Sequence, residues 1–164
     1  MQEEGYIKFK ANWKRTPPLT DYNMDELLTW RDRLYQRHLI GADPNGIGFG
    51  NLSERVDRRE FLITGSATGG EPKLKPEHLA LVYAVHIERN EVSCRGPVIA
   101  SSESMSHAAV FHSLPWVNSV IHVHHLKMWE YWKDRLPTTP PEATYGTPLM
   151  AKGIIHLLRN HPSH

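Results

Sequence analysis

Strand-like and helix-like stretches alternate along this chain of 164 residues, and the alternation favours an α/β fold. The clearest helix is predicted over residues 23–40, where apolar side chains such as Leu27 and Leu34 recur at helical spacing. Acidic residues favour its first turn, and Gly41 is predicted to end it.

Two pairs of strands are predicted in the middle of the chain. Residues 51–56 and 61–64 form one hairpin, which follows a glycine-rich stretch. Residues 79–88 and 92–94 form the second pair, joined by a polar turn at residues 89–91. The connection between the two strands of each pair is short, so both pairs are predicted to be antiparallel.

The second half of the chain predicts a strand between helices. Ser101 or Ser102 can cap a helix, and residues 117–123 have the β-branched content of a buried strand. Further helices are predicted over residues 126–134 and 149–159. Because hairpins and helical crossovers both occur, these elements predict an α/β sandwich around a mixed sheet.

One domain over residues 1–164 accommodates all of these elements, because a chain of this length fits a single core. Residues 1–20 are predicted to form an N-terminal arm or edge strand. Within them, residues 6–10 alternate as a strand does, and Pro17 and Pro18 then interrupt the pattern.

Charge and cysteine content limit the function. Lys and Arg total 19 against 18 Asp and Glu, so no basic field for nucleic acid and no polybasic membrane anchor is expected. Cys94 is the single cysteine, and no apolar stretch reads as a signal peptide or a transmembrane helix. We therefore expect a cytoplasmic protein that acts on a small molecule.

Histidines are frequent, at 11 residues, and two of them are spaced as metal ligands. On the strand predicted at residues 117–123, His122 and His124 point to the same face, so both imidazoles can reach one ion. The alternative, which the spacing leaves open, is two hydrogen-bonded polar side chains on one strand face.

Glu103 is predicted to lie at the start of the helix after the two serines. A carboxylate at a helix N-terminus is electrostatically favoured and can move protons, although a purely structural charge in the first turn is common there. His107 lies one turn further on the same face, where it can orient Glu103 or serve as a core histidine.

Two polar, glycine-containing segments could hold an anion. Residues 63–70 supply hydroxyls and backbone N–H groups after a strand, the kind of concavity that binds phosphate or carboxylate. Residues 50–53 place a polar Asn51 beside a strand. Each segment taken alone is also compatible with an ordinary turn.

Taken in order, these motifs resemble the class II aldolase and adducin family. The resemblance extends from the first helix to Arg159, and it implies a three-layer α/β/α sandwich with a central mixed, mainly antiparallel sheet. It also implies a homotetramer with sites between subunits. The family completes its metal site with a third histidine on a later strand, and we expect the present chain to end before that histidine. The motifs are Gly50-Asn51-Leu52-Ser53, Ile63-Thr64 to Thr68-Gly69, Ser101 to His107, and His122-Val123-His124.

The resemblance also assigns roles to particular residues. It implies that His122 and His124 bind a divalent metal, with Zn2+ the best match, and that Glu103 is the acid/base carboxylate. The positions that match the family's site for a substrate phosphate are Asn51, Thr68, Gly69, Ser101 and Ser102.

The function implied is an aldolase-type carbon–carbon lyase. It would act on a small hydroxy-ketone or sugar phosphate through a metal-stabilised enediolate. Two alternatives stay open. The same site in the family also serves epimerases and dehydratases, and adducin-like members are non-catalytic interaction modules.

Overall fold

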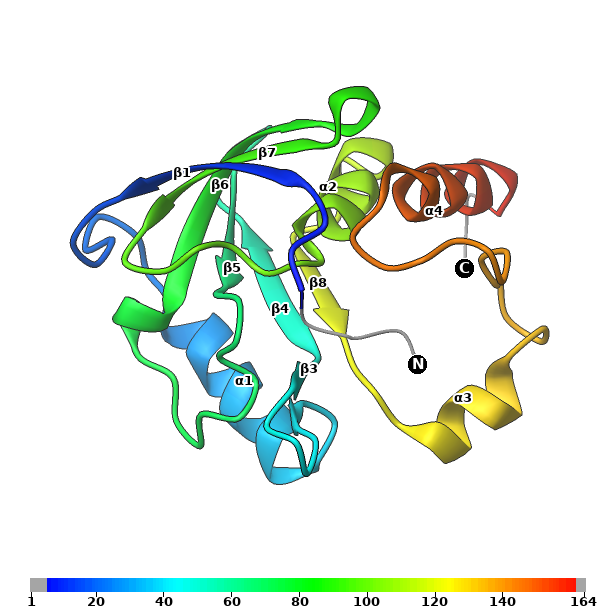
Figure 1. Ribbon diagram of the computed structural model, residues 1–164, viewed down its shortest axis with the longest axis horizontal. Helices are drawn as coiled ribbons and strands as arrows, with labels where there is room; N and C mark the ends of the chain where they lie inside the picture. Colours follow the sequence, from blue (N-terminus) through cyan, green and yellow to red (C-terminus); the bar gives the residue numbers. More distant parts are fainter. Residues whose placement is uncertain (1–5, 162–164) are drawn as a thin grey trace.

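A six-stranded sheet forms the centre of the molecule in the computed structural model, which describes residues 6–161 (Figure 1). The strand order is β1-β7-β6-β5-β4-β8. Only β1 and β7 are parallel, and every other neighbouring pair is antiparallel. The predicted mixed, mainly antiparallel sheet is therefore confirmed. Its strands are β1 (Lys10–Arg15), β4 (Asn51–Arg55), β5 (Phe61–Thr64), β6 (Leu79–His86), β7 (Glu91–Gly96) and β8 (Ser119–His122).

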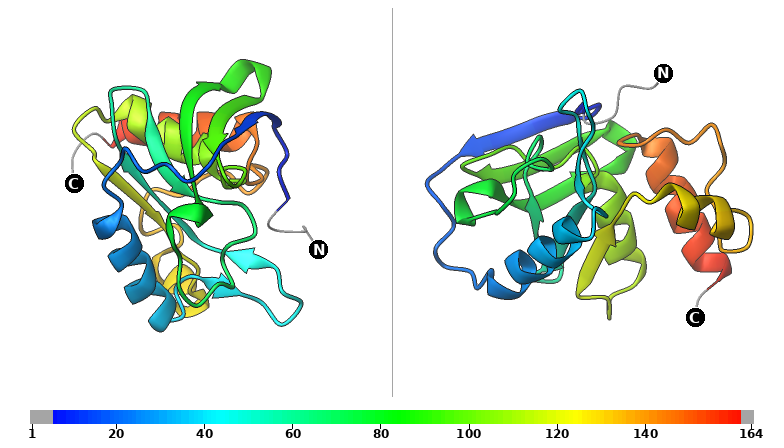
Figure 2. Two further views of the ribbon diagram at one scale, coloured as in Figure 1. Left: turned by 90° about the vertical axis from the view of Figure 1, so that its left-hand side faces the viewer. Right: turned by 90° about the horizontal axis from the view of Figure 1, so that it is seen from below.

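Helices cover the sheet on both faces (Figures 1 and 2). On one face lies α1, and on the other lie α2 and α4. The helix α3 stands away from the sheet and buries no residue. The four helices are α1 (Asp25–Gln36), α2 (Ser104–Ser113), α3 (Leu126–Trp132) and α4 (Pro148–Asn160), and the shorter elements are η1 (Pro76–His78), η2 (Ile87–Arg89) and the ribbon of β2 (Gly41–Ala42) with β3 (Gly48–Phe49).

Strict alternation along the central strands explains the layers. Leu62 of β5 and Leu81 of β6 point to the α1 face, whereas Ile63 and Val82 point to the face of α2 and α4. Successive side chains of a strand project to opposite faces, so a strand that is apolar at every position is buried on both. The three-layer α/β/α arrangement follows from this pattern.

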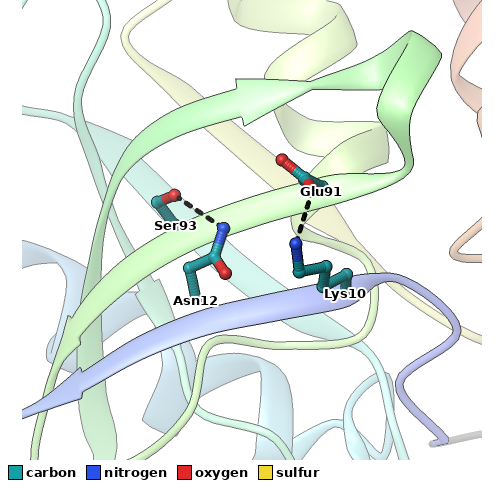
Figure 3. A network of polar contacts seen from close by, with 4 residues as sticks. All are labelled: Lys10, Asn12, Glu91 and Ser93. Carbon is teal, nitrogen blue, oxygen red and sulfur yellow. Dashed lines mark hydrogen bonds and ion pairs between the residues drawn. The ribbon is translucent and has the colours of Figure 1, made fainter.

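The N-terminal strand differs from its prediction. Residues 6–10 were expected to form the strand, but β1 begins at Lys10 and runs parallel to β7 at the sheet edge. Polar side chains hold this edge, with the Lys10 Nζ 2.9 Å from Glu91 Oε1 and the Asn12 amide donating to Ser93 Oγ over 3.5 Å (Figure 3). The alternating pattern predicted an edge strand in the N-terminal segment, but it did not predict which residues pair with β7.

The end of α1 also needs correction. The helix stops at Gln36 rather than near Ile40, and Gly41 belongs to β2 instead of ending the helix. The N–H groups of Arg37 and His38 bond to carbonyls of the last turn, and His38 takes a left-handed conformation with φ 57°. A histidine in that conformation reverses the chain where a glycine was expected.

The strand β8 was predicted to be buried, and that prediction is wrong. Among the described residues it pairs only with β4, so it lies at the sheet edge and leaves Ile121 48% exposed. Its β-branched residues favour a strand, but they do not determine how many neighbours the strand has. No helix within residues 6–161 is long and apolar enough to cross a membrane.

Candidate active site

A pocket of about 930 Å3 lies where the edge of the sheet meets α2, α3 and α4. It gathers segments far apart in sequence, which neither strand nor helix periodicity could have brought together. Seven of the eight predicted site residues line it, namely Asn51, Gly69, Ser101, Ser102, Glu103, His122 and His124. The eighth, Thr68, is buried beside it, and its hydroxyl donates to the Gly65 carbonyl over 2.8 Å.

The two predicted metal ligands lie side by side. His122 is the last residue of β8, and His124 follows in the segment leading to α3, with ring centroids 4.8 Å apart. The His124 N–H donates to the Leu39 carbonyl over 3.0 Å, which holds this segment against the end of α1. His125 accepts the N–H of Met128 and caps α3. The spacing therefore predicted the proximity, although the strand ends earlier than expected.

Burial keeps His122 neutral. Loss of solvent, and then the nearby His124, lower the pKa of His122 from 6.5 to about 4. A neutral imidazole is the form that binds a metal ion. Across the antiparallel pair of β4 and β8, the Asn51 amide nitrogen lies 3.3 Å from His122 Nδ1, and the amide oxygen is buried without a partner in the described structure.

Glu103 is the N-cap residue of α2, so the prediction that Ser101 or Ser102 caps the helix is wrong. Instead the Ser101 hydroxyl accepts the Glu103 N–H over 3.2 Å, one residue before the first helical turn. The Ser106 hydroxyl donates to Glu103 Oε2 over 2.7 Å. This geometry fixes the carboxylate at the wall of the pocket, where it is 9% exposed.

Neutral groups line the side of the pocket formed by the two predicted anion segments. None of the lining residues in the described chain is Lys or Arg. The Ser101 oxygen accepts a hydrogen bond, so its own proton is left to donate, and Ser102 adds a second hydroxyl. The N–H groups of Gly65 and Ser66, however, already bond to the carbonyls of His78 and Ile99, so these two are not available to an anion.

The comparisons with known proteins agree with this arrangement. The model of the Class II Aldolase and Adducin N-terminal domain family matches residues 34–161. The chain belongs to this family. Class II aldolases and adducins share the domain, so the family supports aldolase- or epimerase-like chemistry while also including non-catalytic members. No curated protein matches the chain at a significant level.

Solved structures share the class II aldolase fold with the chain. It is similar to L-fuculose 1-phosphate aldolase with a TM-score of 0.60 and 22% identity, over 82% of this chain and 66% of the other. The YgbL proteins of Escherichia coli and Klebsiella pneumoniae, candidate aldolases, epimerases or decarboxylases, each give 0.60 at 18% identity, covering 81% of this chain and 68% of theirs. The chain thus spans about two thirds of the length of these proteins.

Class II aldolases typically use a divalent metal, and the donors in this pocket fit part of such a site. Two adjacent imidazoles, one of them neutral through burial, suit an ion of the zinc type. Within residues 6–161, no group of three or more His, Cys, Asp or Glu side chains could hold a metal. His122 and His124 would therefore be two of its ligands, and Glu103 does not complete a compact site with them.

Sequence reasoning missed Arg31, which supports the loop beside the pocket. Its side chain is 1% exposed, and its Nη2 donates to the carbonyls of Gly69, over 2.8 Å, and Thr68, over 3.2 Å. The loop also packs closely, since a Cβ on Gly69 would lie 2.4 Å from the Gly41 oxygen. The available signal was the position of Arg31 one turn after the buried Leu27, on the apolar face of α1.

Proposed function

We propose that this aldolase/adducin domain is a metal-dependent carbon–carbon lyase that acts on a small hydroxy-ketone or sugar phosphate. The observation that carries the proposal is the convergence of three chemical groups in one pocket. A histidine pair at the end of β8, and a carboxylate with two serine hydroxyls at the start of α2, line the same cavity. A lyase of this class requires a Lewis acid, a proton carrier and a site for the substrate anion.

Each group then has a role. When bound, a divalent ion such as Zn2+ supplies Lewis acidity for negative charge that develops on a substrate's carbonyl and hydroxyl oxygens. His122 and His124 hold the ion, and Glu103 carries the proton that is delivered after carbon–carbon cleavage or removed in condensation. The hydrogen bond from Ser106 keeps the Glu103 carboxylate in one orientation, as proton transfer at a defined atom requires.

The phosphate is proposed to lie in the same cavity, against the start of α2 and the loop that carries Gly69. Asn51, Ser101 and Ser102 offer neutral donors to it, and Gly69 lines this part of the pocket without a side chain. Thr68 is proposed to have another role than the phosphate binding that the family resemblance implies. Its hydroxyl already donates to the Gly65 carbonyl and its carbonyl accepts from Arg31, so we propose that Thr68 shapes the loop beside the anion site.

Epimerase or dehydratase chemistry is the alternative within the same site, because both also begin with a stabilised carbanion next to a carbonyl. The non-catalytic adducin-like module is the alternative from another class. Burial of Glu103 and the neutral state of His122 favour the enzyme, since desolvated ionisable groups around a cavity are costly for a purely structural domain.

A homotetramer is the proposed assembly. Apolar side chains on β8 and α3 are exposed, including Ile121 at 48% and Trp129 at 57%. Such a surface favours association, because apolar area gains free energy when it leaves water. Light scattering on the purified protein would measure the mass, and a monomer at micromolar concentration would contradict this assembly.

Zinc binding tests the proposed function. Calorimetry on metal-free protein should show one divalent ion per chain, and His124→Ala should abolish binding. Because no third His, Cys, Asp or Glu within residues 6–161 joins His122 and His124 in a metal site, the affinity should be weaker than that of three-ligand sites. His156→Ala is the matched control, because His156 is exposed on α4 and bonds Asn160. Absence of zinc binding by the unmodified protein would contradict the metal-dependent mechanism.

A further inference from the structure

Asn51 and His122 face each other as direct partners in the antiparallel pair of β4 and β8. The side chain of Asn51 is 7% exposed, and its amide nitrogen lies 3.3 Å from His122 Nδ1. The other end of the same amide, Oδ1, is buried and has no hydrogen-bond partner in the described structure. A buried polar atom without a partner is costly, so an orientation of this amide that gives Oδ1 a donor is favoured.

The direction of the amide determines which nitrogen of His122 can bind a metal. A neutral imidazole carries one N–H and one lone pair. If the amide nitrogen donates to Nδ1, the proton must reside on Nε2, and Nε2 cannot be a ligand. If the amide turns by half a rotation, Oδ1 accepts from Nδ1–H, and the lone pair of Nε2 is available for an ion.

We propose that Asn51 is a positioning residue of the metal site, whose Oδ1 accepts the Nδ1–H of His122 and so directs the Nε2 lone pair to the ion. The presence of a metal in this inference rests on the proposed function. The contact between Asn51 and His122 does not. Metal-binding histidines generally donate their second N–H to an oxygen, and Asn51 is the side chain bonded to His122 Nδ1 here.

The rotation also connects the metal site to the anion site. After it, the amide NH2 takes the place of the partnerless oxygen on a residue that lines the pocket. An anion can accept from that NH2, and the metal requires the same rotation. Metal and phosphate therefore favour one orientation of one amide, so each should raise the affinity for the other by the same factor.

The next two residues of β4 are committed elsewhere. Ser53 is the next residue of β4 on the same face, and its hydroxyl lies 2.6 Å from His107 Nδ1. Leu52 between them points to the α1 face. On the α2 face, β4 thus presents two polar side chains, Asn51 facing His122 and Ser53 facing His107.

NMR of the imidazole rings in metal-free protein tests the contact directly. In phosphate buffer at neutral pH, the 1H–15N correlations of His122 should show the Nδ1–H tautomer. Asn51→Leu should lose this preference, because it removes the acceptor while keeping a similar volume. A His122 ring found mainly as Nε2–H in the unmodified protein saturated with phosphate would overturn the proposal, whether or not the protein binds metal, because phosphate alone should favour the turned amide.

Zinc affinity gives the second readout. Asn51→Leu should weaken binding about 10- to 100-fold, the usual cost of losing a partner of a ligating histidine. Asn51→Asp retains an acceptor oxygen and should stay within about threefold of the unmodified protein, or bind more tightly, since its charge strengthens the imidazole as a ligand. Asn12→Leu, the same substitution at the opposite edge of the sheet (Figure 3), should have no effect.

The outcomes separate the two proposals. Equal affinity in Asn51→Leu and the unmodified protein would overturn the positioning role, and so would equal losses in Asn51→Leu and Asn51→Asp. If the unmodified protein binds no zinc, the proposed function fails, while the tautomer of His122 still decides the role of Asn51. Thermal unfolding of each variant identifies a loss that comes from misfolding, and Asn51→Asp then supplies the decisive comparison with the unmodified protein.

Discussion

The Ser53 hydroxyl on β4 lies 2.6 Å from Nδ1 of His107 on α2, and this contact joins the central sheet to the helix that carries Glu103. His107 is fully buried and lines the pocket, and its Nε2 has no hydrogen-bond partner in the described structure. Burial first, and then the proximity of His122, lower the pKa of His107 to about 3. The contact therefore involves a neutral imidazole in the native state.

Acid should destabilise the metal-free protein, beginning near pH 6.5. The native pKa values of His107 and His122 are about 3 and about 4, below the ordinary value of 6.5, so the unfolded chain takes up protons first. Stability is then fully present above pH 6.5 and falls as the pH decreases towards the native values, with each histidine adding up to about 1.4 kcal/mol per pH unit. Urea unfolding at several values between about pH 4 and pH 8 measures how the free energy of unfolding depends on pH.

His107→Gln should reduce this slope, because one of the two titrating groups is removed. His156→Gln, on the exposed surface of α4, is the control and should leave the slope unchanged. If the slopes of the His107→Gln variant and the unmodified protein coincide, His107 is not neutral in the native state.

Glu103→Gln should leave the fold and the metal content nearly intact and lower turnover by about two to four orders of magnitude. The amide is similar in shape and can still contact Ser106, but it cannot carry the proton. Metal analysis and steady-state kinetics on an identified substrate measure the two properties separately. Glu142→Gln, on the exposed loop before α4, is the matched control, and unchanged turnover in Glu103→Gln would remove Glu103 from the mechanism.

Ser102→Ala should weaken the binding of phosphorylated substrates much more than that of the free sugars. The hydroxyl is one of the neutral donors at the proposed anion site, and one lost hydrogen bond to a charged group corresponds to about 1.5–3 kcal/mol. Competition by paired sugars and sugar phosphates measures the difference. Equal affinities for the two classes in the unmodified protein would contradict a phosphate site.

Arg31→Met should destabilise the protein by about 1–3 kcal/mol or more, because carbonyls of the loop lose their buried donor. Phosphate affinity should fall with it, since the same loop contributes Gly69 to the pocket. Arg33→Met, on the exposed side of the same helix, is the control. Urea unfolding and phosphate titration report the two effects, and a variant as stable as the control would show that Arg31 does not hold the loop.

Local patterns were sufficient for most of the fold. Alternating apolar residues predicted the pairs β4–β5 and β6–β7, and helical spacing predicted α1, α3 and α4 with shifted ends. The incorrect predictions share a cause, because each concerns a feature that is set by contacts outside the segment itself. The exposure of β8 reflects the lack of a second neighbouring strand, and the strand at β1 is set by its pairing with β7.

The candidate site was predictable only as a list of residues. The family motifs named seven residues that the pocket does bring together, but their roles stay predictions. No local pattern could show that Ser53 contacts His107 across 54 positions, or that the Arg31 side chain is directed at the loop 37 and 38 positions later. Long-range hydrogen bonds of buried side chains are properties of the assembled fold.

Hydrogen exchange in a substrate is the most direct test of metal-dependent carbanion chemistry in this pocket. Dihydroxyacetone phosphate, a minimal phosphorylated hydroxy-ketone, would be incubated in D2O with the zinc-loaded protein and followed by proton NMR. The proposed mechanism predicts loss of a proton signal at the carbon bearing the free hydroxyl, because Glu103 removes that proton while the ion stabilises the charge. Exchange should cease with a chelator, with His124→Ala and with Glu103→Gln. The proposed mechanism would be contradicted by exchange at the same rate in all of these samples, or by the absence of exchange in the zinc-loaded protein.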